Sequence, residues 1–254
     1  MIVDVFLFND EFDMLECRLY QLRDVVDRFI AIEGDMTLAG DAKPYRLADV
    51  QAEAGRYPRV EVIKASLVDL KDTPSQRQAW VAEGMEHRWK RDWKQRAACS
   101  NLVRDLPEDT TIMYGDVDEI PRTTAVMDFD GKKSRLMMQM LVYSTHWGTE
   151  SDSWTGTVIG KKPDMKSFPH EHRARNNNPM ISNAGWHLTW FGGMEACLRK
   201  SMMFAHGELD KPHQVARRYF DHVMPGDGER LLPYAGDLPA WVEDGHAPPV
   251  WTAR

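Results

Sequence analysis

The first 34 residues constrain the fold more than any other part of the chain, because the residue pattern changes twice within them. Residues 2–8 are mostly β-branched and aromatic, which predicts a short buried strand. Apolar residues then recur at helical spacing from Leu15 to Val26, and residues 29–32 form a second short apolar run. The order strand, helix, strand indicates a βαβ unit with parallel strands and a right-handed crossover.

Polar side chains follow three predicted strands of the sheet. Asn9 and Glu11 come after the first strand, and Glu33 follows residues 29–32. Residues 110–114 are predicted to form another strand, and they lead directly into Gly115 and a group of acids. In an open α/β sheet, ligands bind beyond the carboxyl ends of the strands, so these side chains are expected to meet at one edge.

The acidic group lies in the stretch IMYGDVDEIPR, residues 112–122, which contains Asp116, Asp118 and Glu119. Such close carboxylates repel one another, so a folded protein keeps them with a cation, a shared proton or ample water. A solvated acidic turn is the simple alternative, since aspartate is common in turns. The convergence of three strand ends favours a ligand site over that alternative.

A short Asp-x-Asp after a strand suits a hard divalent cation, and Mn²⁺ or Mg²⁺ would fit. Such an ion would neutralise and orient a leaving diphosphate. The sequence excludes an EF-hand, because Pro121 occupies the position where that calcium loop needs glycine.

The rest of the chain predicts further elements in less detail. Residues 37–58 are interpreted as mostly loop, residues 60–63 as a strand, and residues 76–103 as one or two helices. The tryptophans of that helical region are expected to pack as apolar anchors; they are Trp80, Trp89 and Trp93.

After Pro121 the pattern is richer in aromatic residues, methionine and turns. It predicts a strand at residues 136–143, a tryptophan-rich loop at 144–156, a short strand at 158–159 and a turn at 176–179. Helices are predicted at residues 198–204 and 215–223, the second limited by Pro212 and Pro225. From Pro225 onward, glycine and proline predict a loosely structured tail on the surface. The predicted fold class is α/β, a single domain with a mostly parallel central sheet.

Composition and charge exclude several classes of function. The net charge is −7 and the pI is near 5.7, so the chain lacks the basic excess that a nucleic-acid partner requires. No run reaches the ~18 apolar residues of a membrane span, and the N-terminal residues do not resemble a signal peptide. The three cysteines include no Cys-x-x-Cys pair, which favours a reducing compartment. We therefore expect a cytoplasmic protein.

Five stretches resemble one family in the order in which that family carries them. They are FNDEFDMLECRLYQLRDVVDRFIAIEGDMTLAGDAKP (8–44), Gln95 with Arg96, YGDVDEIPR (114–122), GWHLTWFGG (185–193) and FAHGEL (204–209). Together they resemble glycosyltransferase family 17, the family of the β-1,4-mannosyl-glycoprotein 4-β-N-acetylglucosaminyltransferases and their bacterial and viral relatives. The resemblance spans roughly residues 2 to 210, and the closing segment carries no such motif.

This resemblance implies a GT-A-like, Rossmann-related domain over residues 1–254. Its parts would be a nucleotide-sugar-binding half (1–122), an acceptor half (123–210) and a C-terminal helix and tail (211–254). The implied activity is a metal-dependent, inverting sugar transfer from UDP-N-acetylglucosamine to a glycan hydroxyl. The resemblance assigns the metal to Asp116 and Asp118, and the ribose or diphosphate to Arg96. Residues matching the N-terminal signature would line the nucleotide crevice; they are Asn9, Glu11, Glu33, Thr37 and Lys43.

This sequence differs in one respect from the animal enzymes of the family that it resembles, which have an N-terminal membrane anchor and a luminal domain. This chain shows neither in its sequence. We therefore expect a bacterial surface polysaccharide, a lipid-linked glycan or another cytosolic glycan precursor as acceptor, rather than a protein N-glycan.

An inverting transfer needs a base within hydrogen-bond reach of the acceptor hydroxyl. The eligible carboxylates are Glu119, Glu150, Asp152, Glu195 and Glu208. The catalytic candidates are Asp118, which also holds the metal, Glu119, Asp152 and Glu208. His206 is a candidate third metal ligand, because the family resemblance implies a late histidine that completes the metal shell.

Aromatic residues are the candidates for contacts with the sugars, because tryptophan rings offer large flat apolar faces. The acceptor or sugar-binding candidates are Trp147, Trp154, Trp186 and His187. Core packing is the alternative for Trp147, Trp154 and His187. Two other functions compete with the transferase: a carbohydrate- or nucleotide-sugar-binding protein without turnover, and a metal-dependent phosphohydrolase. The sequence does not indicate an oligomeric state.

Overall fold

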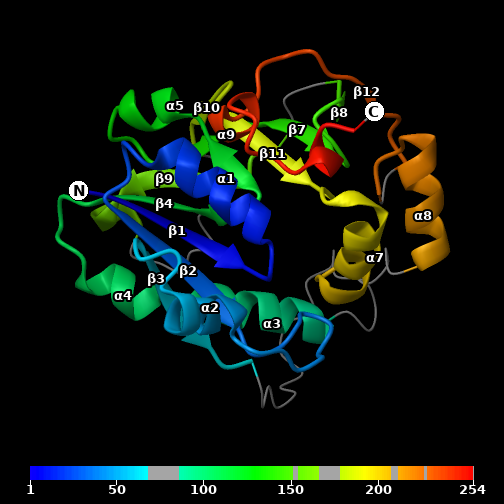
Figure 1. Ribbon diagram of the computed structural model, residues 1–254. Helices are drawn as coiled ribbons and strands as arrows, with labels where there is room; N and C mark the ends of the chain where they lie inside the picture. Colours follow the sequence, from blue (N-terminus) through cyan, green and yellow to red (C-terminus); the bar gives the residue numbers. More distant parts are fainter. Residues whose placement is uncertain (68–85, 151–153, 166–177, 207–210, 226–227, 254) are drawn as a thin grey trace.

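Two mixed β-sheets and the helices around them organise the chain (Figure 1). The computed structural model describes residues 1–67, 86–150, 154–165, 178–206, 211–225 and 228–253. Parts of four predicted elements lie outside these residues: 76–85 of the predicted helical region, with Trp80, 151–153 of the predicted tryptophan-rich loop, Asn176 and Asn177 of the predicted turn, and 226–227 and 254 of the predicted tail.

The larger sheet confirms the predicted fold class. Its seven strands among the described residues have the order β10–β6–β9–β4–β1–β2–β3. They are β1 (Ile2–Phe8), β2 (Arg28–Gly34), β3 (Val60–Ala65), β4 (Thr111–Asp116), β6 (Ser134–Leu136), β9 (Val158–Lys161) and β10 (Met180–Ile181). β3, β2, β1 and β4 run parallel, while β9 runs antiparallel to both β4 and β6. The architecture is therefore α/β with a mostly parallel central sheet.

Helices cover both faces of this sheet, as Figure 1 shows. They are α1 (Phe12–Leu22), α2 (Arg46–Ala54), α3 (Glu86–Ala97) and α4 (Ser100–Asp105). Successive residues of β1 point to opposite faces, so Phe6 packs in one cluster with Leu15 and Leu47 of α1 and α2. Val5 packs in the other cluster with Val103 of α4. Both faces of β1 are buried, as expected for a central parallel strand.

Helix α2 was not predicted, because residues 37–58 were interpreted as mostly loop. The start of α2 is stabilised by Glu33, whose carboxylate accepts the backbone N–H groups of Leu47 and Ala48. Gly55 ends the helix in a left-handed conformation with φ 61°. The loop prediction was wrong because the residue that satisfies the helix N-terminus comes from a strand 14 positions earlier.

The smaller sheet is built from short strands that are distant in sequence. Its order is β12–β8–β7–β11–β5. The strands are β5 (Glu119–Pro121), β7 (Gln139–Val142), β8 (Trp147–Gly148), β11 (Gly185–Thr189) and β12 (Leu232–Pro233). β11 pairs parallel with β7 and antiparallel with β5. This sheet begins at the acidic stretch, because β5 follows β4 after only two residues.

Two sequence predictions fail in this region. The single strand predicted at 136–143 is two strands, since the chain leaves the larger sheet after Leu136 and enters the smaller sheet at Gln139. The loop predicted at 144–156 contains β8, which pairs with β7 and β12. Apolar residues continue across the junction at Met137 and Met138, so the pattern gave no sign of the change of sheet.

Helices α7 (Gly193–Met203) and α8 (Pro212–Asp221) lie beside the smaller sheet, at the right of Figure 1. α7 follows β11 and packs against α8. Pro212 was expected to limit α8, but it occupies the first turn, where proline has no helical hydrogen bond to lose. Three further short elements are α5 (Thr123–Met127), η1 (Lys162–Met165) and η3 (Pro249–Trp251).

The C-terminal segment is packed on the core, and the prediction of a loose surface tail was wrong. Trp241 of α9 (Ala240–Glu243) and Trp251 of η3 are buried in the cluster that contains Leu15. The backbone N–H of Ala240 donates to Gln21 Oε1, which fixes α9 against α1. Burial of each large apolar side chain stabilises the fold by roughly 1.5–3 kcal/mol, which outweighs the loop-forming tendency of the glycines and prolines around it.

Strands after residue 122 contribute to both sheets, so the division into 1–122, 123–210 and 211–254 stays a prediction about function. Within the part of the chain that the structure describes, no helix has the length and apolar character needed to cross a bilayer.

Candidate active site

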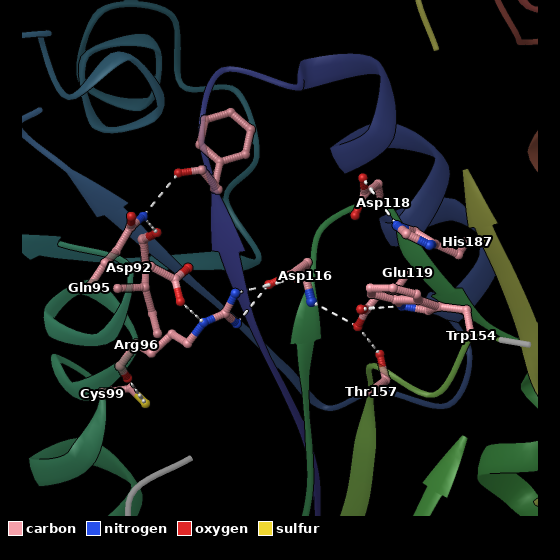
Figure 2. A network of polar contacts seen from close by, with 12 residues as sticks. Asp92, Gln95, Arg96, Cys99, Asp116, Asp118, Glu119, Trp154, Thr157 and His187 are labelled. Carbon is pink, nitrogen blue, oxygen red and sulfur yellow. Dashed lines mark hydrogen bonds and ion pairs between the residues drawn. The ribbon is translucent and has the colours of Figure 1, made fainter. Parts of the chain in front are cut away.

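The acidic turn, residues 116–119, joins the end of β4 to the start of β5 and therefore lies where the two sheets meet. The backbone N–H of Val117 donates to the carbonyl of Leu7, which places the turn beside the end of β1. Val117 itself is buried in the core. Figure 2 shows that Asp116, Asp118 and Glu119 point to different partners. The turn thus presents its carboxylates separately.

Asp116 is paired with Arg96 of α3. Arg96 Nη1 lies 2.8 Å from Asp116 Oδ1, and Nη2 lies 3.5 Å from Oδ2. The same guanidinium donates through Nε to Asp92 Oδ2 at 2.8 Å. Burial alone would lower the pKa of Arg96, but Asp116 and Asp92 outweigh burial and raise that pKa further. Arg96 is therefore a fixed cation beside Asp116.

The residue before Arg96 holds α3 against the sheet. Gln95 Nε2 donates to the carbonyl of Ile32 at 2.8 Å and to the carbonyl of Phe8 at 3.4 Å. These carbonyls lie in β2 and β1, so the Gln95–Arg96 pair connects the ends of three strands (Figure 2).

Asp118 has basic partners from the second sheet and its helix. Its Oδ2 lies 2.9 Å from Lys200 Nζ of α7 and 3.6 Å from His187 Nε2 of β11. Burial works to raise the pKa of Asp118, but Lys200 and His187 outweigh it and hold the pKa below its ordinary value. Asp118 is therefore ionised at neutral pH, although its side chain is only 9% exposed.

Glu119 is buried and its carboxylate accepts three hydrogen bonds. Oε2 accepts the backbone N–H of Asp116 at 3.0 Å and the hydroxyl of Thr157 at 2.6 Å, and Oε1 accepts Trp154 Nε1 at 2.6 Å. A Cβ at Gly115 or Gly156 would overlap this carboxylate. Its contacts show that Glu119 holds the turn and a tryptophan in place.

Trp154 and His187 form a stacked pair next to Asp118. Their ring centroids are 4.3 Å apart with an interplanar angle of 28°. His187 is also paired with Glu119 through the backbone register of β11 and β5. Its Nδ1 is buried and has no hydrogen-bond partner among the described residues. This pair brings together two of the predicted sugar-binding residues.

A buried ion pair between Arg18 and Asp4 holds the backbone of the acidic turn. Arg18 of α1 pairs with Asp4 of β1 at 2.7 Å, and both side chains are fully buried. Arg18 Nη1 also donates to the carbonyls of Asp116, at 2.9 Å, and Glu119. One guanidinium therefore holds both ends of the turn.

Asn9 and Glu11 lie at the end of β1, as predicted. The Glu11 carboxylate accepts the backbone N–H of Asn9 at 2.8 Å. Burial raises the pKa of Glu11 to about 7; Lys200 opposes this rise, and Asp118 adds to it. The electrostatic influence of both residues places Glu11 in the same charged environment as the acidic turn.

The three predicted residues around the end of β2 organise the loop that follows it. Glu33 holds the start of α2, and burial raises the pKa of its carboxyl group. Lys43 Nζ lies 3.2 Å from Asp10 Oδ1 and 3.6 Å from Glu33 Oε1. The Thr37 hydroxyl accepts the backbone N–H groups of Gly40 and Asp41. Their contacts keep the rim of β1 and β2 in one conformation.

Other predicted residues do not join this group. The His206 ring contacts Trp89 and Phe204, and within the described residues no three His, Cys, Asp or Glu side chains are placed to hold a metal ion. Packing against these aromatic rings accounts for its position. Asp152 and Glu208 lie outside the described residues. Glu195 is exposed and pairs with Arg199.

The remaining two tryptophan candidates have structural contacts. Trp147 stacks on His222 with centroids 3.9 Å apart. Trp186 is buried, lies under the Arg122 guanidinium and donates through Nε1 to the carbonyl of Asp237. Trp186 is therefore a core residue, although it was predicted only as a sugar-binding candidate.

The sequence analysis missed Lys200, Arg18 and Asp4. Arg18 had a signal, because it shares the buried face of α1 with Met14, Leu15 and Leu22, where a cation needs a buried partner. Lys200 had none, since it is one cation among others in a mixed helix.

The chemistry of the acidic turn fits a divalent cation. Asp118 is kept ionised, and the Asp116 side chain is 28% exposed with Oδ2 farther from Arg96 than Oδ1. Two carboxylates from one turn, with oxygens from a diphosphate and water, are a sufficient ligand set for Mg²⁺ or Mn²⁺.

Comparison with known proteins gives a family match across most of the chain. The sequence model of glycosyltransferase family 17 matches residues 1–218. The β-1,4-mannosyl-glycoprotein 4-β-N-acetylglucosaminyltransferases of Rattus norvegicus and Homo sapiens are each 29% identical over 128 residues. That segment is 50% of this chain and 22% and 23% of the two relatives, so the match spans less than a quarter of their length.

Solved structures give a weaker likeness. An active-site mutant of LgtC is 12% identical, with a TM-score of 0.35, and the match covers 95% of this chain and 89% of that one. Galactosyltransferase LgtC in complex with donor and acceptor sugar analogs is 13% identical, with a TM-score of 0.33, over 97% and 91% of the two chains.

Proposed function

The chain belongs to glycosyltransferase family 17, and on that premise we propose that it transfers a sugar from a nucleotide-sugar donor to a hydroxyl group of a glycan. We propose UDP-N-acetylglucosamine as the donor, because the curated relatives that match half of the chain carry N-acetylglucosaminyltransferase names. The proposed reaction inverts the anomeric carbon.

The observation that carries the proposal is the position of Asp116 and Asp118. Both follow a parallel strand at the edge where ligands bind in α/β sheets, and each pairs with a basic side chain. Lys200 and His187 keep Asp118 ionised. We propose that these carboxylates hold Mn²⁺ or Mg²⁺, which would supply positive charge to the leaving diphosphate.

The donor crevice in this proposal lies between the ends of β1 and β2 and the acidic turn. Lys43, which pairs with Asp10 and Glu33, keeps this rim ordered. Arg96 supplies a fixed positive charge next to Asp116, in reach of the anionic part of a nucleotide.

Trp154 and His187 are proposed to bind the sugar rings. Glu119 fixes the Trp154 ring through Nε1, so its orientation is set before a ligand arrives. An ordered aromatic face loses little conformational entropy when a sugar packs on it.

The acceptor base is proposed among three carboxylates, because Glu119 already accepts hydrogen bonds from three donors and Glu195 is exposed and paired with Arg199. They are Glu150, Asp152 and Glu208. The base deprotonates the acceptor hydroxyl as that oxygen attacks the anomeric carbon.

We propose that the reaction takes place in the cytoplasm. The three cysteines support this proposal, since all are free and buried, and burial raises the pKa of each thiol. Such thiols need no oxidising compartment.

The test is a thermal-shift screen of the full chain with UDP, GDP and CMP sugars, each with and without Mn²⁺. We expect UDP-N-acetylglucosamine with Mn²⁺ to raise the melting temperature most, because a ligand that binds only the native state stabilises it. A coupled assay of UDP release then measures turnover.

The two competing functions give other results. A binding protein without turnover shows the same thermal shift but releases no UDP, with or without a glycan acceptor. A phosphohydrolase releases phosphate from simple esters and needs no sugar nucleotide. A chain that no sugar nucleotide stabilises would contradict the proposal.

A further inference from the structure

Lys200 places a positive charge directly on the acidic turn. Its Nζ lies 2.9 Å from Asp118 Oδ2 and 3.4 Å from the Thr189 hydroxyl. The residue belongs to α7, which follows the smaller sheet, whereas Asp118 follows the larger one. The ion pair therefore joins the two parts of the molecule at the candidate site.

The ammonium group of Lys200 is charged and partly accessible. Burial alone would lower the pKa of Lys200, but Asp118 and Glu11 outweigh burial and raise that pKa. The side chain is 26% exposed, compared with 9% for Asp118. Solvent reaches Lys200 more readily than it reaches the carboxylate that Lys200 covers.

The two cations of the site are held differently. Arg96 has two carboxylate partners, Asp92 and Asp116, and a planar group that fits both. Among the described residues, Lys200 has one carboxylate within hydrogen-bond distance, and its ammonium group stands at the end of a flexible four-carbon stem. Lys200 can exchange its partner by rotation of its own side chain, while Arg96 would have to give up a second ion pair.

A divalent ion and an ammonium group compete for the same carboxylate oxygen. Like charges a few ångströms apart repel, so Asp118 Oδ2 cannot serve both cations at full strength. A diphosphate that arrives with the ion supplies new anionic oxygens, and these are a suitable second partner for Lys200.

We propose that Lys200 is an exchangeable internal cation: it covers Asp118 in the absence of donor and transfers its ion pair to the donor diphosphate when a divalent ion binds. This inference rests on the proposed function of the site. Its consequence is that metal ion and nucleotide bind cooperatively, and each raises the affinity of the other by the same factor.

The experiment is a Mn²⁺ titration of the full chain, followed by electron paramagnetic resonance of the free ion, with and without UDP. For the unmodified protein we expect weak Mn²⁺ binding alone and roughly 10- to 100-fold tighter binding with UDP. Lys200→Met should bind Mn²⁺ alone several-fold more tightly, because the competing charge is gone. The factor by which UDP improves Mn²⁺ binding should fall.

A second measurement separates the diphosphate from the rest of the nucleotide. Isothermal titration with UDP and UMP in the presence of Mn²⁺ should show a smaller UDP-to-UMP difference in Lys200→Met than in the unmodified protein. Lys200→Arg keeps the charge and should keep most of that difference. Lys200→Gln replaces Lys200→Met if the latter does not fold.

Arg199→Met is the matched control. Arg199 is the neighbouring residue on α7, is 57% exposed and pairs only with Glu195 among the contacts described above. It removes the same charge from the same helix, so it should change neither Mn²⁺ affinity nor its dependence on UDP.

Three results would overturn the inference or its premise. If Lys200→Met melts at a lower temperature but keeps the Mn²⁺ affinity and the UDP dependence of the unmodified protein, Lys200 is only structural. If the unmodified protein binds UDP equally with and without Mn²⁺, the exchange does not occur. If it binds neither ligand, the proposed function fails instead.

Discussion

Asp116 and Asp118 are two residues apart, and the protein holds the two sides of the turn in different ways. Asp116 faces α3, where Arg96 is locked between two carboxylates. Asp118 faces α7, where Lys200 has one close carboxylate within the part of the chain that the structure describes; His187 lies 3.6 Å from Asp118. A rigid cation on one side and an exchangeable cation on the other let the turn keep its shape while one of its carboxylates changes partner.

The largest expected effect is on stability, and it comes from Arg18, whose guanidinium donates to the backbone carbonyls at both ends of the acidic turn. Arg18→Met leaves Asp4 charged and buried without its partner, and two carbonyls lose their donor. We expect a loss of about 3–5 kcal/mol in the free energy of unfolding, measured by urea denaturation. Arg23→Met is the control, because Arg23 is an exposed residue and should change stability by less than about 0.5 kcal/mol.

The double variant Asp4→Leu with Arg18→Met tests the reason for that loss. It removes the unpaired charge but still leaves the carbonyls of Asp116 and Glu119 without Arg18, so it should recover only part of the stability. A single Arg18→Met protein within about 1 kcal/mol of the unmodified one would contradict the role of this ion pair.

The next effect is on turnover, from the carboxylates themselves. Asp116→Asn and Asp118→Asn should each reduce kcat for sugar transfer by about 100- to 1000-fold, because each removes charge that faces the developing diphosphate. The rate of UDP release at saturating Mn²⁺ measures this. Asp105→Asn, which changes an exposed carboxylate of α4, should leave the rate unchanged. Full activity of Asp118→Asn would remove the metal role from the proposal.

A smaller effect, on the KM for the donor, tests the contrast between Arg96 and Lys200. Arg96→Lys keeps one positive charge but cannot hold Asp92 and Asp116 together. We expect about a tenfold increase in the donor KM, with kcat less affected, in steady-state kinetics. An unchanged KM would mean that the second ion pair of Arg96 does not position Asp116.

The smallest expected effect is on the pH dependence of stability. It concerns Glu11, which interacts electrostatically with Lys200. Its pKa is raised from 4.5 to about 7, so the folded protein keeps a proton that the unfolded chain loses above pH 4.5. Stability should therefore fall as the pH rises from about 4.5 to 7 and stay level above that. Because Glu11 is partly exposed, solvent screening keeps this on the order of 1 kcal/mol.

Glu11→Gln should flatten this part of the pH profile, measured by thermal unfolding of the metal-free protein at several pH values. Glutamine retains an oxygen for the backbone N–H of Asn9, so the local hydrogen bond is preserved. A profile that keeps its slope in Glu11→Gln would assign the pH dependence to another group.

The part of the fold that sequence predicted well is local. β1, α1 and β2 occur where the residue pattern changed, because strand and helix periods are readable over a few residues. The position of Asp116 and Asp118 at a strand end followed from the same pattern. The shared position of Asn9, Glu11 and Glu33 at one edge of the sheet was also predictable, because the carboxyl ends of parallel strands meet at the same edge.

The parts that sequence did not predict depend on distant partners. Helix α2 needs Glu33 of β2, and the smaller sheet needs β5, β7 and β11 to come together from separate stretches. Lys200 is 82 residues from Asp118, so no local pattern indicates their contact. The role of Glu119 was also hidden, since only the packing of Gly115 and Gly156 around it shows why its carboxylate is buried.

Because the C-terminal segment packs against α1, the core around α1 is completed late during synthesis. β1, α1 and β2 leave the ribosome before residues 240–251, and α9, which carries Trp241, packs against α1. Until residues 240–251 emerge, the part of α1 that contacts α9 is uncovered. A truncation before residue 240 would make that transient exposure permanent and would favour aggregation.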